Sequence, residues 1–117
     1  MNDAVLAERW YAAWNAHDLE AILALYAEDI EFSSPYIAAL GFAADGVIED
    51  KAMLRAYFEL GLARSPDMRF TPESLCVGAR GHTLIFRTEK GVRVAEHHQT
   101  DGRGLIVRAE ATYETTS

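Results

Sequence analysis

Apolar residues near the start of the chain recur at spacings of three and four positions, the period of one helix face. This pattern predicts a helix over residues 3–16, which Asn2 or Asp3 can cap. Its apolar face consists of Leu6, Trp10, Ala13 and Trp14. After an interruption at His17, Asp18 can cap a second short helix, which carries Leu19, Ile22, Leu23, Leu25 and Tyr26. A third helix is predicted over 51–63, capped by Asp50 and stopped by Ser65-Pro66.

The rest of the chain has the character of strands and turns. Residues 30–35 alternate in polarity and end at a proline, which predicts a short strand, and 36–49 is expected to be a loop rich in Ala and Gly. Four more strands are predicted at about 68–77, 82–88, 92–100 and 105–113. This order predicts a single α+β domain over 1–117, in which three N-terminal helices pack on a curved, largely antiparallel sheet around one pocket.

Turn lengths set the register of the last three strands. A four-residue turn at 101–104 pairs the last two strands, and the expected partners are Thr100 with Leu105, His98 with Val107, and Glu96 with Ala109. A three-residue turn ending at Gly91 puts Leu84 opposite Glu96 and His82 opposite His98. The faces expected to point inward are Val92, Val94, Glu96, His98 and Thr100, and Leu105, Val107, Ala109, Ala111 and Tyr113. Two titratable side chains therefore border a volume left by small alanines.

Composition limits the possible functions. The 117 residues carry a net charge of −7 and no cluster of Lys and Arg, which opposes binding to nucleic acid. No apolar run is long enough to span a membrane, and the first residues lack the features of a signal peptide. Cys76 is the only cysteine, so an internal disulfide is impossible; we expect it to be buried and the protein to be cytoplasmic.

Glu96 and His98 are the strongest candidates for catalysis, because an acid and a base close together on an apolar face tune each other's proton affinity. The plainer alternative is a buried ion pair, or two polar groups at the solvated end of the sheet. His82 and His98 alone, without a third inward ligand, do not predict a metal site, and no cofactor is expected. His97 should point to the opposite face.

Three segments resemble a known family. They are RWYAAWNAHDLEAILALYAEDI at 9–30, KAMLRAYF at 51–58 and DGRGLI at 101–106. The first is similar to the start of SnoaL-like proteins, which belong to the nuclear transport factor 2-like superfamily with ketosteroid isomerases, limonene-epoxide hydrolases and polyketide cyclases. Asp50 stands where members typically have a glycine. The resemblance implies a cystatin-like cone of helices and sheet with one internal pocket.

Carried over from ketosteroid isomerases, the resemblance places Ser34 where that family has its general-base aspartate. Trp10 replaces an oxyanion-hole tyrosine, and Glu96 falls near a protonated aspartate of the same hole. Tyr26 matches a second tyrosine of the family's network, and Phe58 replaces a third. Because serine does not replace a carboxylate as proton acceptor, the resemblance does not imply steroid isomerisation. The Arg-Asp dyad of epoxide hydrolases is not evident either.

The sequence thus predicts a small-molecule-binding domain with an apolar, aromatic-lined pocket. Glu96 and His98 are its candidate catalytic residues, for isomerisation, cyclisation or hydrolysis. The expected ligand contacts are Trp10, Trp14, Phe32, Ser34, Phe58 and Tyr113. The competing interpretation is a non-catalytic homodimer that carries a ligand or binds a partner. A homodimer is expected in either case, through the outer face of the sheet formed by Arg93, His97, Gln99, Arg108, Glu110 and Thr112.

Overall fold

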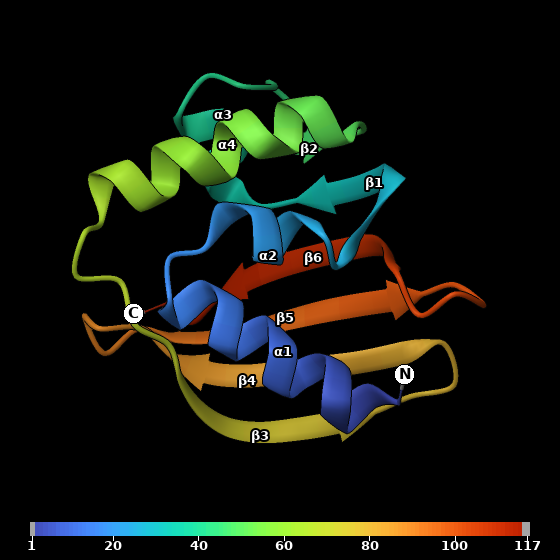
Figure 1. Cartoon of the computed structure of the whole chain (residues 1–117). Helices are drawn as coiled ribbons and strands as arrows, with labels where there is room; N and C mark the ends of the chain where they lie inside the picture. The colour runs from blue at the N-terminus through green and yellow to red at the C-terminus, as the bar shows by residue number, and fades with distance from the viewer. Residues whose placement is uncertain (1, 116–117) are drawn as a thin grey trace.

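The computed structural model describes residues 2–115, and its helices lie mainly in the first half of the chain (Figure 1). They are α1 (Asp3–Asn15), α2 (Leu19–Leu23), α3 (Pro35–Ala39) and α4 (Lys51–Arg64). The three expected caps are present: the side chains of Asn2, Asp18 and Asp50 each accept a hydrogen bond from a backbone N–H of the first turn. Polar caps thus fix where α1, α2 and α4 begin.

One six-stranded sheet forms the second layer (Figure 1). Its strands are β1 (Tyr26–Ser33), β2 (Val47–Ile48), β3 (Thr71–Val77), β4 (Gly81–Arg87), β5 (Arg93–Thr100) and β6 (Ile106–Tyr113), in the order β2-β1-β6-β5-β4-β3. Every neighbouring pair is antiparallel except β1 and β6, which run parallel. Helix α1 crosses β3 and β4, while α4 packs on β1. The α+β class, the mixed sheet and the central place of β5 are confirmed.

Two local predictions in the first half of the chain are wrong. Tyr26 opens β1 instead of ending the second helix, because Leu25 and Tyr26 already lie alongside Ile106 of β6. The segment 36–49 contains α3 and β2 as well as loop. Pro35 begins α3 at its first position, where a missing N–H costs nothing, and Ser34 caps it.

The predicted register is right on one side of β5 and wrong on the other. Leu84 pairs with Glu96 and His82 with His98, as expected. On the other side the pairs are displaced by two residues, so that His98 faces Ala109 and Glu96 faces Ala111. A displacement of two keeps Glu96, His98, Ala109 and Ala111 on their predicted face.

The cause of the displacement lies in the turn after β5. Gly104 adopts a positive φ of 80°, and a bulge interrupts the ladder between Gln99 and Thr100. The bulge reverses the facing at the start of β6, so Ile106 is buried, whereas Leu105 and Val107 are only partly buried. The prediction that those two residues point to the core is therefore wrong.

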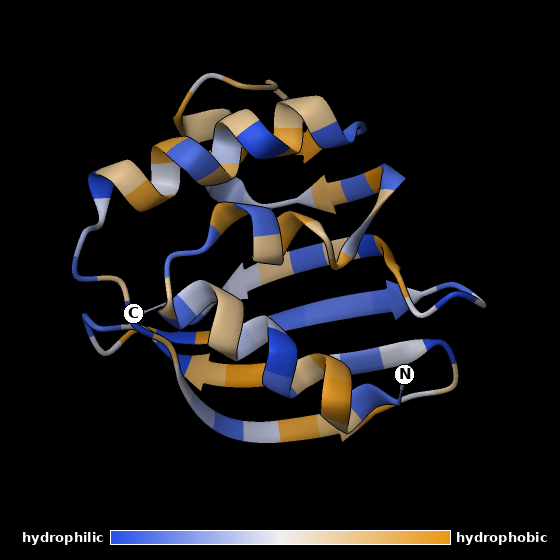
Figure 2. Cartoon of the chain, in the orientation of Figure 1, coloured by the Kyte–Doolittle hydropathy of each residue, from blue (hydrophilic) through white to orange (hydrophobic). Residues whose placement is uncertain are grey.

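Polarity along the chain follows the layers, with one exception. Helices α1 and α4 carry both apolar and polar segments, whereas β5 is drawn almost wholly as hydrophilic although it is an interior strand (Figure 2). Its buried polar residues are Glu96 and His98. Cys76 is exposed rather than buried, because it lies on β3, an edge strand whose residues are all exposed. Among residues 2–115, no helix has the length and apolar character that crossing a membrane requires.

Candidate functional site

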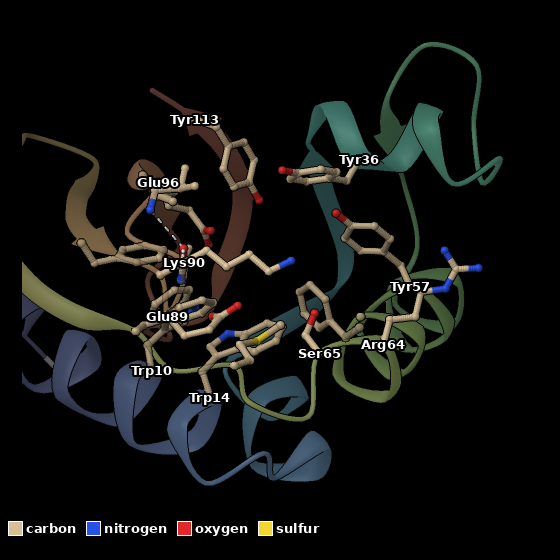
Figure 3. A pocket seen from close by; sticks show the side chains of 18 of the residues that line it. Trp10, Trp14, Tyr36, Tyr57, Arg64, Ser65, Glu89, Lys90, Glu96 and Tyr113 are labelled. Carbon is tan, nitrogen blue, oxygen red and sulfur yellow. Dashed lines mark hydrogen bonds between the residues drawn. The ribbon is translucent and has the colours of Figure 1, made fainter. Parts of the chain in front are cut away.

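A cavity of about 300 Å³ opens between the sheet and the helices α1 and α4 (Figure 3). Aromatic side chains form a large part of its wall. Trp10 and Trp14 come from α1, Phe32 from β1, Phe58 from α4, and Tyr113 from β6. Neighbouring rings meet edge to face, as in the Trp14–Phe58 pair, whose centroids are 4.8 Å apart. The cavity therefore suits a small molecule with an apolar body.

Glu96 is the acidic group in this apolar wall. It lies on β5 with only 6% of its surface exposed, and its carboxyl group borders the cavity (Figure 3). Oε2 of Glu96 lies 2.7 Å from Nε2 of His98, so the two side chains are hydrogen-bonded. Burial without such a partner would be costly for a carboxylate. The predicted inward orientation of Glu96 is confirmed. Its apolar surroundings solvate an ionised carboxylate poorly.

Behind Glu96, a line of hydrogen bonds runs away from the cavity. Nδ1 of His98 lies 3.0 Å from Nε2 of His82, and Nδ1 of His82 lies 2.9 Å from Oδ1 of Asp3 in the first turn of α1. The side chains of both histidines are completely buried, whereas that of Asp3 is 31% exposed. Burial lowers the pKa of His82. Across residues 2–115, no three His, Cys, Asp or Glu side chains converge as metal ligands do.

Three tyrosines lie around the cavity across from the tryptophans. The side chains of Tyr36, Tyr57 and Tyr113 extend toward one another at the upper side of the pocket (Figure 3). Burial raises the pKa of Tyr57 and Tyr113, and the nearby charge of Glu96 raises both further. Both hydroxyls thus stay protonated; that of Tyr57 donates to Ser34, and that of Tyr113 can donate to a ligand oxygen.

Of the residues predicted to contact a ligand, five line the cavity and one does not. Trp10, Trp14, Phe32, Phe58 and Tyr113 belong to the wall. Ser34 lies behind it, where its Oγ accepts hydrogen bonds from Tyr57 Oη and the backbone N–H of Tyr36, each 3.3 Å long. Of the two candidate catalytic residues, Glu96 borders the cavity, whereas His98 lies behind Glu96.

The two tryptophans differ in what their indole N–H groups can do. Nε1 of Trp10 donates to the hydroxyl of Tyr26 at 3.0 Å, so it is already occupied. Nε1 of Trp14 is buried and has no acceptor among the residues that the structure describes. A buried donor without a partner costs free energy unless something fills its place. The Trp14 N–H is therefore a buried donor in the cavity wall whose hydrogen-bonding capacity is unused within residues 2–115.

Sequence reasoning missed three contributors to the site. Tyr57 lies within the predicted third helix with nothing local to mark it as a site residue, and Tyr36 falls in the predicted loop because Pro35 reads as the end of a strand. Asp3 was considered only as a helix cap. Its contact with His82 joins positions 79 apart in sequence, and no local pattern reports such a contact.

Comparison with known proteins agrees with this architecture. The sequence profile of the SnoaL-like domain matches residues 7–116. A SnoaL-like protein of unknown function from Burkholderia thailandensis is 31% identical, with a TM-score of 0.90 over 97% of this chain and 95% of its own. No curated protein matches the chain.

More distant structures share the fold alone. A provisionally named ketosteroid isomerase from Kribbella flavida is 17% identical, with a TM-score of 0.73 over 97% of this chain and 78% of its own. A provisionally named polyketide cyclase from Sinorhizobium meliloti is 12% identical, with a TM-score of 0.75 over 92% of this chain and 93% of its own. The nuclear transport factor 2-like, cystatin-like fold is thus common to all of them.

Proposed function

The chain belongs to the SnoaL-like domain family, and from that premise we propose that it binds an apolar small molecule and isomerises it by proton transfer at Glu96. The observation that carries this proposal is the Glu96 carboxyl group in an aromatic wall, hydrogen-bonded at 2.7 Å to a buried histidine. A carboxyl group in such surroundings can serve as a general acid or base.

The donors around the cavity define the kind of substrate. The hydroxyl of Tyr113 and the unpaired indole N–H of Trp14 offer hydrogen-bond donors in an otherwise apolar space, whereas the hydroxyl of Tyr57 already donates to Ser34. A carbonyl oxygen suits them, because its negative charge grows when a neighbouring carbon loses a proton. The substrate class is therefore a compact ketone with an aromatic or alicyclic body.

Isomerisation fits the number of acid–base groups better than hydrolysis does. Glu96 takes a proton from one carbon and returns it to another, so one carboxyl group completes the reaction. Activating a water while protonating a leaving group needs two such groups. The second acid among the cavity residues, Glu89, accepts a hydrogen bond from the backbone of Arg69 at the mouth, on an exposed turn.

Proton exchange of a model ketone tests the proposal. With 2-tetralone in D₂O, the wild-type protein should accelerate replacement of the α-hydrogens by deuterium, followed by ¹H NMR. Glu96→Gln should remove the acceleration, by about 10²–10⁴-fold, the usual contribution of a general base. Glutamine keeps the shape of the side chain, so the variant should still bind 2-tetralone, measured by displacement of the dye 8-anilinonaphthalene-1-sulfonate.

The opposite result is equally clear. If wild-type protein binds 2-tetralone but exchanges its α-hydrogens no faster than Glu96→Gln does, the catalytic proposal fails. Ligand carriage is then the better description of the pocket.

A further inference from the structure

We propose that Asp3, His82, His98 and Glu96 form a proton relay that connects the protein surface with the wall of the pocket. The three distances along it are 2.9, 3.0 and 2.7 Å, all within hydrogen-bond range. Its two inner members are fully buried, and the Asp3 end is the more exposed one, at 31% of its side chain against 7% for Glu96. The relay deepens the function proposed above, since its catalytic use rests on that function, although its existence does not.

The number of hydrogen bonds in the relay requires one proton more than its neutral imidazoles supply. Three hydrogen bonds need three protons, but two neutral imidazoles supply only two, and ionised carboxylates supply none. A third proton must therefore reside on one of the four relay side chains when all three hydrogen bonds are made. Burial lowers the pKa of His82, which disfavours an imidazolium in the middle. The third proton then resides on His98 or on a carboxyl group at one end.

Two of the arrangements that satisfy this count keep both imidazoles neutral, and they differ only in the positions of protons. When Asp3 holds the extra proton, both imidazoles carry hydrogen on Nε2, and Glu96 is an ionised acceptor. When Glu96 holds it, both imidazoles carry hydrogen on Nδ1, and Asp3 is the ionised acceptor. No heavy atom has to exchange partners between the two arrangements.

One concerted shift interconverts them. A proton passes from Asp3 Oδ1 to His82 Nδ1, a second from His82 Nε2 to His98 Nδ1, and a third from His98 Nε2 to Glu96 Oε2. One O–H and two N–H bonds break, and two N–H bonds and one O–H bond form. The negative charge moves from Glu96 to Asp3, where water can solvate it, so Glu96 becomes an acid without drawing a proton through a filled pocket.

The relay works in both directions but does not pump protons. After one shift, the next proton from Asp3 finds His82 Nδ1 already occupied, and only reversal or rotation of both rings resets the chain. The His98 ring is enclosed by Trp10, Tyr26 and His82, with centroids 5.6, 6.4 and 5.1 Å away, which hinders rotation. Such a device serves a reaction that consumes no net proton, as an isomerisation does.

Besides Arg64, Glu89 and Lys90, which are exposed at the same cavity, the other titratable groups around Glu96 are phenols from four different elements. They are Tyr11 of α1, Tyr26 of β1, Tyr57 of α4 and Tyr113 of β6. Burial raises the pKa of each, and the charge of Glu96 adds to the effect. They remain protonated at neutral pH and do not compete for the shared proton. The groups that face His82 are the other members of the relay.

A double-mutant cycle separates a relay from ordinary electrostatics. The Glu96 carboxyl is titrated by ¹³C NMR without any ligand. Asp3→Asn should change its proton affinity about tenfold, the usual size of a coupling between linked sites. In the His82→Gln background, where the amide breaks the relay, Asp3→Asn should leave that affinity unchanged. His97→Gln is the matched control, because His97 contacts Thr83 on the opposite face, and it should preserve the tenfold effect.

Two results would overturn the relay. One is an equal effect of Asp3→Asn with and without His82, which indicates coupling through space. The other comes from ¹⁵N shifts of the wild-type imidazoles, which do not depend on any variant folding: the two rings should change tautomer together during the titration. If either ring keeps one tautomer throughout, the proposal is wrong, whatever the outcome of the 2-tetralone test.

Discussion

At the scale of single residues, His82 is held at both ring nitrogens and has no exposed side-chain surface. Its pKa is lowered by burial, so the unfolded chain binds more protons than the folded one once the pH falls below the ordinary value of 6.5. The stabilisation that uncharged His82 contributes at neutral pH is therefore lost as the pH falls. The stability cost of His82→Gln should shrink between pH 7.5 and pH 5.5, measured by urea unfolding; a constant cost would contradict this.

The two tryptophans of the pocket provide a matched pair of substitutions. Trp10→Phe removes the donor to the buried hydroxyl of Tyr26, whereas Trp14→Phe removes an N–H that has no acceptor in residues 2–115. Beyond the similar loss of ring volume, Trp10→Phe should cost about 1–3 kcal/mol more of unfolding free energy. Thermal and urea unfolding of both variants check this. Equal costs would mean that the Trp10–Tyr26 hydrogen bond contributes nothing net.

The same scale shows what a sequence can reveal about the site. The inward orientation of Glu96 was predictable, because a register error of two residues leaves a side chain on the same face of the sheet. The pairing of His82 with His98 was also predictable, since the turn at Gly91 sets it. Asp3 was not, because the contact depends on how α1 lies across β4, and a three-dimensional packing angle has no counterpart in local periodicity.

At the scale of elements, α4 has an unfilled position facing the pocket. Gly61 lines the cavity, and a Cβ atom built there would meet no heavy atom within 4 Å. Gly61→Ala should raise stability by about 0.5–1 kcal/mol, because alanine is the better helix former. Gly61→Leu should keep the fold but occupy the cavity, so binding of 8-anilinonaphthalene-1-sulfonate should weaken severalfold relative to Gly61→Ala. Unchanged binding would place the dye elsewhere.

Two elements explain why the rest of the fold escaped prediction. A proline ends a strand as readily as it begins a helix, and at Pro35 the helix took precedence because Ser34 caps it. The bulge between Gln99 and Thr100 inserts a residue that the turn length alone does not reveal. Both features depend on tertiary contacts. The caps of α1, α2 and α4, in contrast, can be predicted from the local sequence alone.

At the scale of the whole molecule, we predict a homodimer through the outer face of the sheet. Many charges on that face are already paired within the chain: Glu73 with Arg87 and Arg93, and Glu31 with Arg108. Paired charges make the face less costly to desolvate than free ones. Sedimentation at tens of micromolar, roughly the range of a moderate affinity, should show a dimer. A monomer there would refute the prediction.

Ala95 offers a way to test where the dimer forms. It lies on β5 between Ile85 and Thr112, on the side of the strand opposite Glu96. Ala95→Arg should give a folded monomer if the outer face is the interface. Ala63→Arg, the same substitution at an exposed position near the end of α4, is the matched charge change and should leave the dimer intact.

The exposed thiol of Cys76 turns that question into a distance measurement. Because it is the only cysteine of the chain, a nitroxide reagent attaches one spin label to each subunit without further mutation. The label sits on β3, at the edge of the sheet. Pulsed electron paramagnetic resonance between two such labels distinguishes subunits that pair face to face, with β3 on separate rims, from subunits that join their β3 edges into one continuous sheet, with the two nitroxides nearly in contact.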